Sequence, residues 1–524
     1  MSTESQNTAN QQIARAAGMV MMAFIISNLA GLVRQILVAN AFGTGPAMDA
    51  FTAANRIPET LFNLVAGGAL GSAFIPTFTS LLAKNKQEKA WKLASAIINL
   101  VFLIVTVVAG IAAIFAPQVV RVLAPGVIAN PAQEALTITL TRIMLPSAVL
   151  FGLSGLVMGI LNSKQVFFIP ALMPSMYQIG MIFGVLVLEP IMGIYGLAWG
   201  VVIGAGLHLV LQLPALLRQK GKYTPTLGLD LPDVREVARL MGPRLLGVAV
   251  VQLNFWINVR LASRQPEGSM TAIVFAFALM LMPQAAIAQS IAIAALPTFS
   301  AQVAKKRLGE MRSSLATSLR GVIFLALPAS VGLILLRQPI TTLLYQRGEF
   351  TAHSTVLVAW ALLWYAAGLV GHSVVEILAR AFYALHDTKT PVFVGAGAMA
   401  LNVVFSYTFA ALFESWGWMP HGGLALANSL ATAIEMVVLF YLMSKRLDGI
   451  KGGEIARGGL SATLAGGVMA LALWGWLSKF GGSAAWLAGG GGVVVGGIVY
   501  LGVILALGVK EVKQVLLNVG KLNR

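Results

Sequence analysis

Long apolar runs recur along the whole chain, and they limit its fold more than any other feature. A helix that crosses a bilayer needs about 20 consecutive apolar residues, whereas a transmembrane β-strand needs about ten and alternates in polarity. The chain of 524 residues is 58% hydrophobic and 10% charged, with a mean hydropathy of +0.83. A soluble protein could not bury that much apolar surface. The sequence therefore predicts an all-α polytopic membrane protein.

We expect fourteen transmembrane helices, after a polar segment of residues 1–13 that is predicted to be disordered and cytoplasmic. The expected helices cover approximately 14–40, 50–83, 91–115, 132–160, 166–188, 192–217, 235–262, 270–303, 313–336, 352–384, 391–413, 421–444, 457–477 and 485–508. No cleavable signal peptide is evident, because the first apolar run continues into a helix without a small-residue cleavage site.

The basic residues are distributed unevenly between the two sets of loops. With the N-terminus inside, the inner loops and termini hold 24 Lys and Arg, and the outer loops hold five. Cytoplasmic loops carry the excess of Lys and Arg in membrane proteins, so we expect both termini to be cytoplasmic. This distribution accounts for the net charge of +17 without a nucleic-acid partner, and none is expected.

Short motifs recur at a spacing of 221 to 227 residues. Residues 75–78, Ile-Pro-Thr-Phe, return as Leu-Pro-Thr-Phe at 296–299, and Gly-Leu-Ala at 196–198 returns at 423–425. The offset spans six expected helices, an even number, which predicts a parallel repeat around a central cavity.

The repeat divides the chain into two six-helix lobes and an appendix. The expected N-lobe is 14–217, a cytoplasmic linker covers 218–234, and the C-lobe is 235–444. Residues 445–524 then hold helices 13 and 14 and a cytoplasmic tail, outside the repeat.

One expected helix carries charges at membrane depth. Asp49, Arg56 and Glu59 lie in a segment that continues through Gly67–Gly68 to Pro76. Charged side chains inside a membrane are costly unless they pair or line a wet cavity, and glycine and proline allow a helix to bend. We interpret this segment as one wall of a transport cavity.

The repeat also pairs two arginines, Arg34 in the first helix and Arg260 in the seventh. Two guanidiniums across a cavity would bind an anion, above all a phosphate or pyrophosphate. Two structural alternatives stay open: Arg34 and Arg56 pair with Asp49 to hold helices together, and Arg260 reaches water at a helix end. Asn28 is a further candidate, although interhelical hydrogen bonding explains such a residue equally well.

The sequence contains no signature of an enzyme, a metal site or a cofactor site. Cysteine is absent, the five histidines are scattered, and no phosphate-binding loop is visible. We therefore expect a transporter that is not an enzyme and uses no cofactor.

Several motifs occur in the order seen in one family of transporters. They are Asp49-Ala-Phe, Arg56-Ile-Pro58, Gly68-Ala69, Ala73-Phe-Ile-Pro76, Ala124-Pro-Gly126, Met241-Gly-Pro243, Leu296-Pro297 and Asp387-Thr-Lys-Thr-Pro391. Over essentially its whole length the chain resembles the MurJ (MviN) lipid II flippases of the multidrug/oligosaccharidyl-lipid/polysaccharide exporter superfamily.

The resemblance implies a flippase in the bacterial inner membrane that alternates between inward-facing and outward-facing states without ATP hydrolysis. The pyrophosphate and sugars of lipid II, an undecaprenyl-pyrophosphate glycan, would occupy a central cationic cavity. Its tail would stay among membrane lipids, along a groove formed with helices 13 and 14. A coupling ion or the membrane potential would bias the cycle.

Residue by residue, Arg34, Asp49 and Arg56 fall on family positions. Where the family usually has arginine, this chain has Asn28, Phe62 and Ala278. Our hypothesis is that Arg260 restores one of these charges. The substitutions keep a second function open, a flippase for another polyprenyl-pyrophosphate oligosaccharide. A drug/cation antiporter of the same superfamily is disfavoured, because it would need cavity carboxylates and few arginines.

Overall fold

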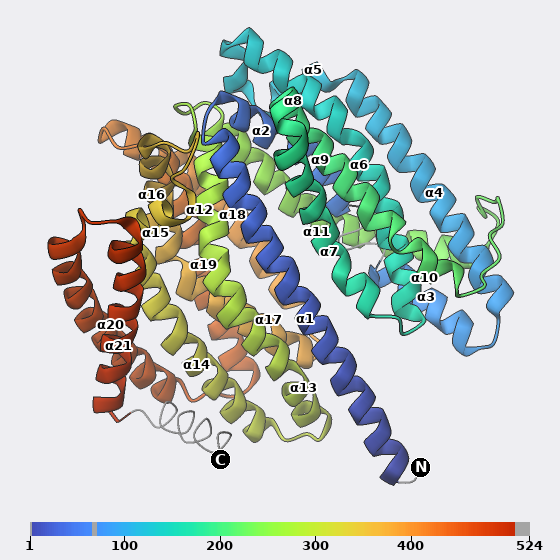
Figure 1. The fold of residues 1–524 in the computed structure, drawn as a ribbon. Helices are drawn as coiled ribbons and strands as arrows, with labels where there is room; N and C mark the ends of the chain where they lie inside the picture. The colour runs from blue at the N-terminus through green and yellow to red at the C-terminus, as the bar shows by residue number, and fades with distance from the viewer. Residues whose placement is uncertain (1–2, 65–70, 509–524) are drawn as a thin grey trace. The chain divides into compact units, whose positions relative to one another are not determined.

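The computed structural model describes residues 3–64 and 71–508, and these residues form helices and connecting loops without a β-strand (Figure 1). The chain divides into two compact units, Met1–Glu267 and Gly268–Arg524. The predicted all-α membrane fold is confirmed.

The first unit is built around α6. Its helices are α1 Thr3–Phe42, α2 Pro46–Leu64, α3 Gly71–Ala83, α4 Gln87–Ile114, α5 Ala116–Leu123, η2 Pro125–Ala129, α6 Pro131–Ser163, α7 Phe168–Phe183, η3 Gly184–Leu188, α8 Glu189–Met192, α9 Ile194–Val210, α10 Leu213–Leu217 and α11 Pro232–Ala262. α6 packs against α2, α4 and α9, and α1 packs against α7. A buried apolar cluster that includes Phe74, Phe78 and Leu93 joins α3 to α4.

Glycines bring α7, its π-helical continuation η3, and α9 into backbone contact. A Cβ added at Gly180 would lie 2.2 Å from the Cα of Gly204, and one added at Gly204 would lie 2.7 Å from the Tyr177 carbonyl oxygen. Small residues allow such close approach between membrane helices, where lipid offers no hydrophobic drive for association.

The second unit is built around α14, α17 and α19. Its helices are α12 Ser269–Gln284, η4 Ala285–Gln289, α13 Ser290–Ala304, α14 Leu308–Leu335, α15 Arg337–Tyr345, α16 Ala352–Ala367, α17 Leu369–Ala384, α18 Lys389–Ser415, α19 His421–Arg446, α20 Gly452–Phe480, η5 Trp486–Gly491 and α21 Gly492–Ala506. The last two helices lie side by side, next to α14 (Figure 1). The Tyr500 hydroxyl donates a 2.8 Å hydrogen bond to the Phe324 carbonyl and ties α21 to α14.

The predicted repeat is visible in the bounds of the helices. α4 and α14 each have 28 residues and begin 221 residues apart. α6 covers 131–163, and α16 with α17 covers 352–384, at the same offset. The left-handed residues beside these spans repeat as well: Asn85 and Lys306 precede α4 and α14, and Gln165 and His386 follow α6 and α17. The offset of 221 inferred from short motifs is therefore a property of the secondary structure.

Among the described residues, 11 helices are long and apolar enough to cross a membrane, or up to 13 if each bent pair counts as one span. The predicted number of fourteen is not confirmed. The predicted second helix is described as α2 and α3, and the residues between them, 65–70, lie outside the described part.

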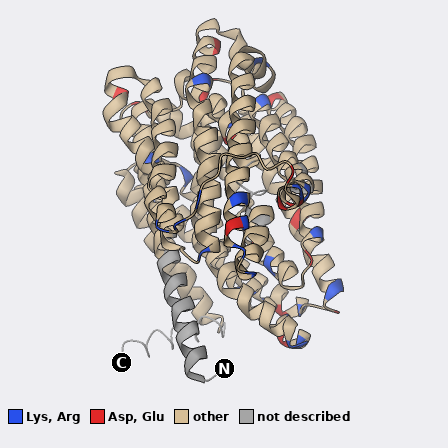
Figure 2. Cartoon of the chain, turned by 90° about the vertical axis from the view of Figure 1, so that its right-hand side faces the viewer, with Lys and Arg blue, Asp and Glu red and all other residues tan. Residues whose placement is uncertain are grey.

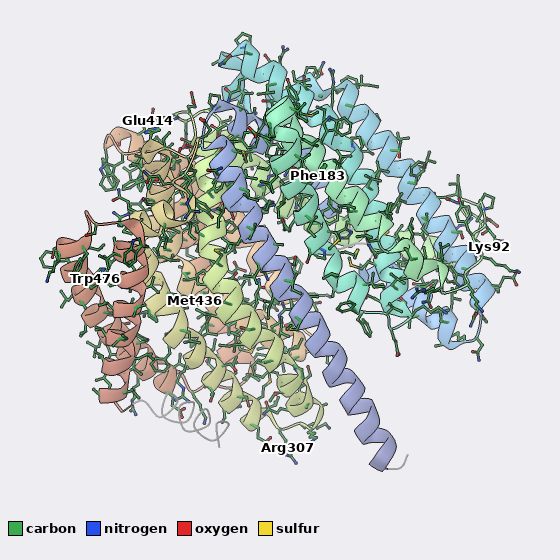
Figure 3. The ribbon with its side chains drawn as sticks, in the orientation of Figure 1. Lys92, Phe183, Arg307, Glu414, Met436 and Trp476 are labelled. Atoms are coloured by element: carbon green, nitrogen blue, oxygen red, sulfur yellow. The ribbon has the colours of Figure 1, made fainter. Side chains whose placement is uncertain are left out.

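The outer surfaces of the helices have the character of lipid-facing surfaces. Figure 2 shows long stretches of helix without a charged residue. Large apolar side chains such as Phe183 project from the helices (Figure 3), and Ile191 and Phe393 are exposed.

The packing of α11 does not follow the division of the chain that the repeat predicts. The sequence places this helix first in the C-lobe, 235–444, yet it packs against α2, α3, α4 and α5 of the first unit. The division into lobes 14–217 and 235–444 stays a prediction.

Candidate substrate-binding site

Arg56, in the middle of α2, is held on two sides. Its Nη1 lies 3.1 Å from Oε2 of Glu59, one turn further along the same helix. Its guanidinium carbon lies 4.8 Å from the centre of the Phe255 ring on α11. A cation over an aromatic face is attracted by the ring quadrupole. The Arg56 side chain is only 14% exposed, whereas that of Glu59 is 40% exposed.

A polar bridge between α2 and α11 sets this geometry. The Thr60 hydroxyl donates to the Arg56 carbonyl at 2.7 Å and accepts from Nε1 of Trp256 at 2.8 Å. Gln252 Oε1 lies 3.4 Å from the same hydroxyl, and both side chains are buried. α11 therefore positions Phe255 over Arg56. The sequence analysis missed Thr60, Phe255 and Trp256. The only signal was the presence of polar residues such as Thr60 within an apolar span.

Arg34, on α1, lies near the same group. Its Nη1 donates to Met181 Sδ at 3.5 Å, and among the described residues it forms no ion pair. Arg34 and Glu59 both lie within electrostatic range of the buried Tyr177 phenol on α7. The structure thus gathers Arg34, Arg56, Glu59, Tyr177 and Phe255, which we call the arginine cluster.

The other predicted positions on α1 and α2 flank this cluster. Asp49 is buried in the first turn of α2, two turns before Arg56, and Asn28 is exposed on α1. Phe62 packs on Phe151, with ring centres 4.8 Å apart, so an aromatic contact occupies that position. Gly67 and Gly68 lie outside the described residues.

Arg260 has a different environment, at the end of α11. Its Nη1 donates to the carbonyl of Val122 in α5. Next to it, Ser263 Oγ accepts from the Gly126 N–H at 3.2 Å, and a Cβ at Gly126 would collide with the Ser263 carbonyl. These contacts dock the end of α11 onto the segment after α4, and none of them joins Arg260 to the arginine cluster. A substrate role for Arg260 stays a prediction.

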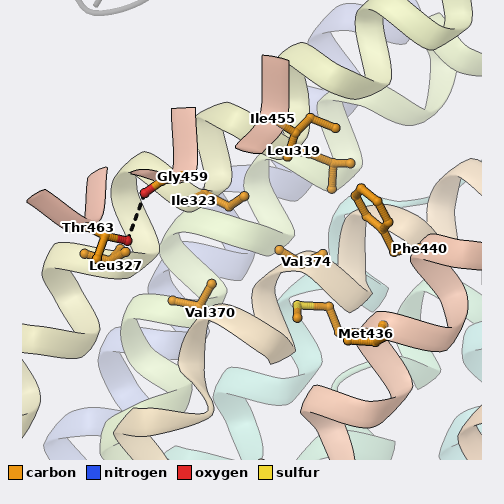
Figure 4. A pocket seen from close by; sticks show the side chains of 11 residues that line it. Leu319, Ile323, Leu327, Val370, Val374, Met436, Phe440, Ile455, Gly459 and Thr463 are labelled. Atoms are coloured by element: carbon orange, nitrogen blue, oxygen red, sulfur yellow. Dashed lines mark hydrogen bonds between the residues drawn. The ribbon is translucent and has the colours of Figure 1, made fainter. Parts of the chain in front are cut away.

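The second unit contains an apolar groove of about 400 Å³ between α14, α17, α19 and α20. Its lining residues are Leu319, Ile323, Leu327, Val370, Val374, Met436, Val437, Phe440, Ile455, Gly459 and Thr463 (Figure 4). The Thr463 hydroxyl is the polar side-chain group in this lining, and it donates to the Gly459 carbonyl at 2.9 Å. A groove with this lining suits a hydrocarbon chain.

Among the described residues, no group of three or more His, Cys, Asp or Glu side chains is arranged to hold a metal ion. The first unit presents the guanidiniums of Arg34 and Arg56, the latter over the Phe255 ring, and guanidiniums favour binding of an anion such as phosphate.

The chain also matches known proteins over most of its length. A sequence model of the family described as lipid II flippase MurJ matches residues 38–488. The chain belongs to the MurJ family of lipid II flippases. This membership confirms the resemblance drawn from the motifs, and it identifies a polytopic membrane transporter rather than an enzyme.

Two curated relatives and two solved structures illustrate the match. Lipid II flippase MurJ of Burkholderia cenocepacia is 33% identical over 80% of this chain and 82% of its own length. Probable lipid II flippase MurJ of Bdellovibrio bacteriovorus is 29% identical over 96% of this chain and 97% of its own length. A MurJ structure in an inward closed conformation shares the fold with TM-score 0.80 and 24% identity, covering 94% of this chain and 99% of its own. An inward-facing multidrug transporter of the MATE family, from the MOP superfamily, shares the fold with TM-score 0.69 and 15% identity, covering 83% of this chain and 99% of its own.

Proposed function

We propose that this chain moves lipid II from the inner to the outer leaflet of the bacterial inner membrane by alternating access. The family supplies the substrate class, and the arginine cluster supplies a binding site of matching chemistry. The observation that carries the proposal is that Arg34 and the Arg56–Glu59 pair belong to one compact unit, with Arg34 and Glu59 both within electrostatic range of Tyr177. Guanidiniums bind phosphate oxygens bidentately, and lipid II carries a pyrophosphate.

Within this proposal, six residues take part in recognising the head of the substrate. Arg34 and Arg56 bind the pyrophosphate, Glu59 adjusts the charge of Arg56, and Asp49 neutralises part of the excess positive charge when the site is empty. Asn28 contacts the sugars. Arg260 contributes if α11 leaves its dock on α5 during the cycle.

The polyprenyl tail stays in the apolar phase throughout. The groove that includes Val374, Met436 and Phe440 has an apolar lining that suits a hydrocarbon chain. α20, the predicted helix 13, forms one side of it, whereas α21 supplies no lining residue. We place part of the tail there while the head crosses.

The orientation and the driving force complete the proposal. The excess of Lys and Arg in one set of loops supports cytoplasmic termini. The membrane potential or an ion gradient biases the cycle, since moving one charge across it is worth about 2.3 kcal/mol per 100 mV.

The proposal is tested in cells whose own lipid II flippase is depleted and which express this chain instead. Lipid II should become accessible to a probe added outside, and it should stay inaccessible when Arg34→Ala is expressed at the same level. Good expression of the unaltered chain with no accessible lipid II would contradict the proposal.

A further inference from the structure

Glu59 is the acid that pairs with Arg56, and the two partners are held very differently. Arg56 is largely buried, capped by the Phe255 ring and anchored through its carbonyl to Thr60. Glu59 shows 40% of its side chain, and among the described residues its ion pair with Arg56 is its one direct polar contact through the carboxylate. The guanidinium is therefore fixed in place, and the carboxylate is free to rotate away.

An ion pair of this kind is weak enough for a substrate anion to replace the Glu59 carboxylate on Arg56. An ion pair between residues one turn apart on a helix is weak when one partner is partly exposed, as Glu59 is. A pyrophosphate diester, with one negative charge on each phosphate and several acceptor oxygens, competes well against one carboxylate for the same guanidinium, because charge-assisted bidentate pairs are the stronger ones.

The position of Glu59 makes that competition unavoidable. Glu59 pairs directly with Arg56, and both Glu59 and Arg34 lie within electrostatic range of the Tyr177 phenol, so the carboxylate acts in the surroundings that the two arginines share. An anion that binds Arg34 and Arg56 together would meet Glu59 as a like charge at short range. It can bind with both arginines only when the carboxylate has moved away from Arg56.

We propose that Glu59 is an internal counter-anion, which occupies Arg56 in the empty transporter and is displaced by the phosphate of the substrate. The proposal rests on the proposed function, because it takes the substrate to be a lipid-linked pyrophosphate. Its consequence is a site that keeps Arg56 neutralised between cycles and releases the anion when Glu59 returns. Glu59 thereby weakens binding and speeds release.

The second unit offers a matched control. Glu376 Oε1 lies 2.8 Å from Nη2 of Arg380, one turn apart on α17, with side chains 25% and 33% exposed. The Arg380 guanidinium carbon lies 5.9 Å from the centre of the Tyr383 ring. This pair has the same chemistry outside the arginine cluster, so Glu376→Gln controls for the loss of a helical ion pair.

The test measures the dissociation constant of purified full-length protein for two probes, lipid II and undecaprenyl pyrophosphate, with undecaprenol as the uncharged reference. Glu59→Gln should lower the Kd for both pyrophosphates on the order of tenfold, because a like charge beside the anion is removed. It should also slow the release of the bound probe. Arg56→Gln should raise the Kd, the double variant should lose the gain, and Glu376→Gln should leave the Kd unchanged.

An unchanged or higher Kd in Glu59→Gln would overturn the proposal that Glu59 is a counter-anion. Glu59→Ala tests the same expectation if the glutamine variant fails to fold. A wild-type protein that binds undecaprenyl pyrophosphate but not lipid II would contradict the proposed function, and a tighter Glu59→Gln would still uphold this inference. Binding of neither pyrophosphate above undecaprenol would overturn both.

Discussion

The guanidinium of Arg56 lies 4.8 Å over the ring of Phe255, and this contact joins α2 to α11 within one compact unit. It occurs beside a hydrogen-bonded bridge through Thr60, so the charge in the arginine cluster and the packing of α11 are linked. The same end of α11 also docks on α5 through Arg260.

Replacement of Phe255 by leucine should weaken the site while the apolar contact is largely kept. The cation–π attraction is worth roughly 0.5–2 kcal/mol, so we expect a loss of transport of about threefold or more and a small fall in melting temperature. Flipping assays and thermal unfolding in detergent measure the two effects. Phe393→Leu, on an exposed face of α18, should change neither.

Removal of the Thr60 hydroxyl should separate α2 from α11. Thr60→Val leaves the half-buried Trp256 N–H and the buried Gln252 amide without their shared partner, which costs about 1–3 kcal/mol of stability. The control is Thr408→Val, whose exposed hydroxyl bonds only to Val404 on its own helix. Equal melting temperatures for the two variants would show that the bridge contributes nothing.

The backbone contact of α7 with α9 predicts unequal tolerance of two glycines on one helix. Gly204→Val would place side-chain atoms against the Tyr177 backbone, and overpacking of this kind costs about 1–3 kcal/mol. Gly206→Val meets no neighbour within 4 Å and should be tolerated. Folded yield and melting temperature distinguish them, and equal behaviour would contradict the close approach.

Asp387, in the loop before α18, should make stability depend on pH. Its carboxylate accepts from the Thr390 backbone N–H at 3.1 Å and from the Thr390 hydroxyl at 2.8 Å, and these bonds lower the pKa of Asp387 below its ordinary value of 3.8. A lowered folded-state pKa stabilises the fold above the unfolded-state pKa, and this contribution disappears as the pH falls through the folded-state pKa. The melting temperature of wild type should exceed that of Asp387→Asn at neutral pH, and the difference should shrink below about pH 4. A difference that does not change with pH would exclude this role.

The sequence was sufficient for the fold class, and it singled out Arg34, Arg56 and Glu59 of the arginine cluster as candidates. The apolar runs predicted membrane helices, and the short motifs around Pro76 and Pro297 predicted the 221-residue repeat that the helix bounds show. Arg56 and Glu59 lie one helical turn apart, so their pairing follows from local geometry. Local periodicity contains no information on which distant helix faces meet, and the contacts of Phe255 and Trp256 with α2 were missed for that reason.

Arg260 illustrates the same limit in another way. Its position in the repeat suggested a partner for Arg34, but in the structure its guanidinium bonds to the main-chain carbonyl of Val122. Every residue carries such a carbonyl, so no pattern of side chains reveals which one an arginine will reach.

The most direct measurement is lipid II flipping by purified protein in liposomes, with lipid II labelled and placed asymmetrically. Wild type should equalise the label between leaflets, Arg34→Ala and Arg56→Ala should reduce the rate to that of protein-free liposomes, and Glu376→Gln should match wild type. Undiminished flipping by both arginine variants would contradict the account of the site. No flipping by the folded wild type, with a membrane potential applied, would contradict the function.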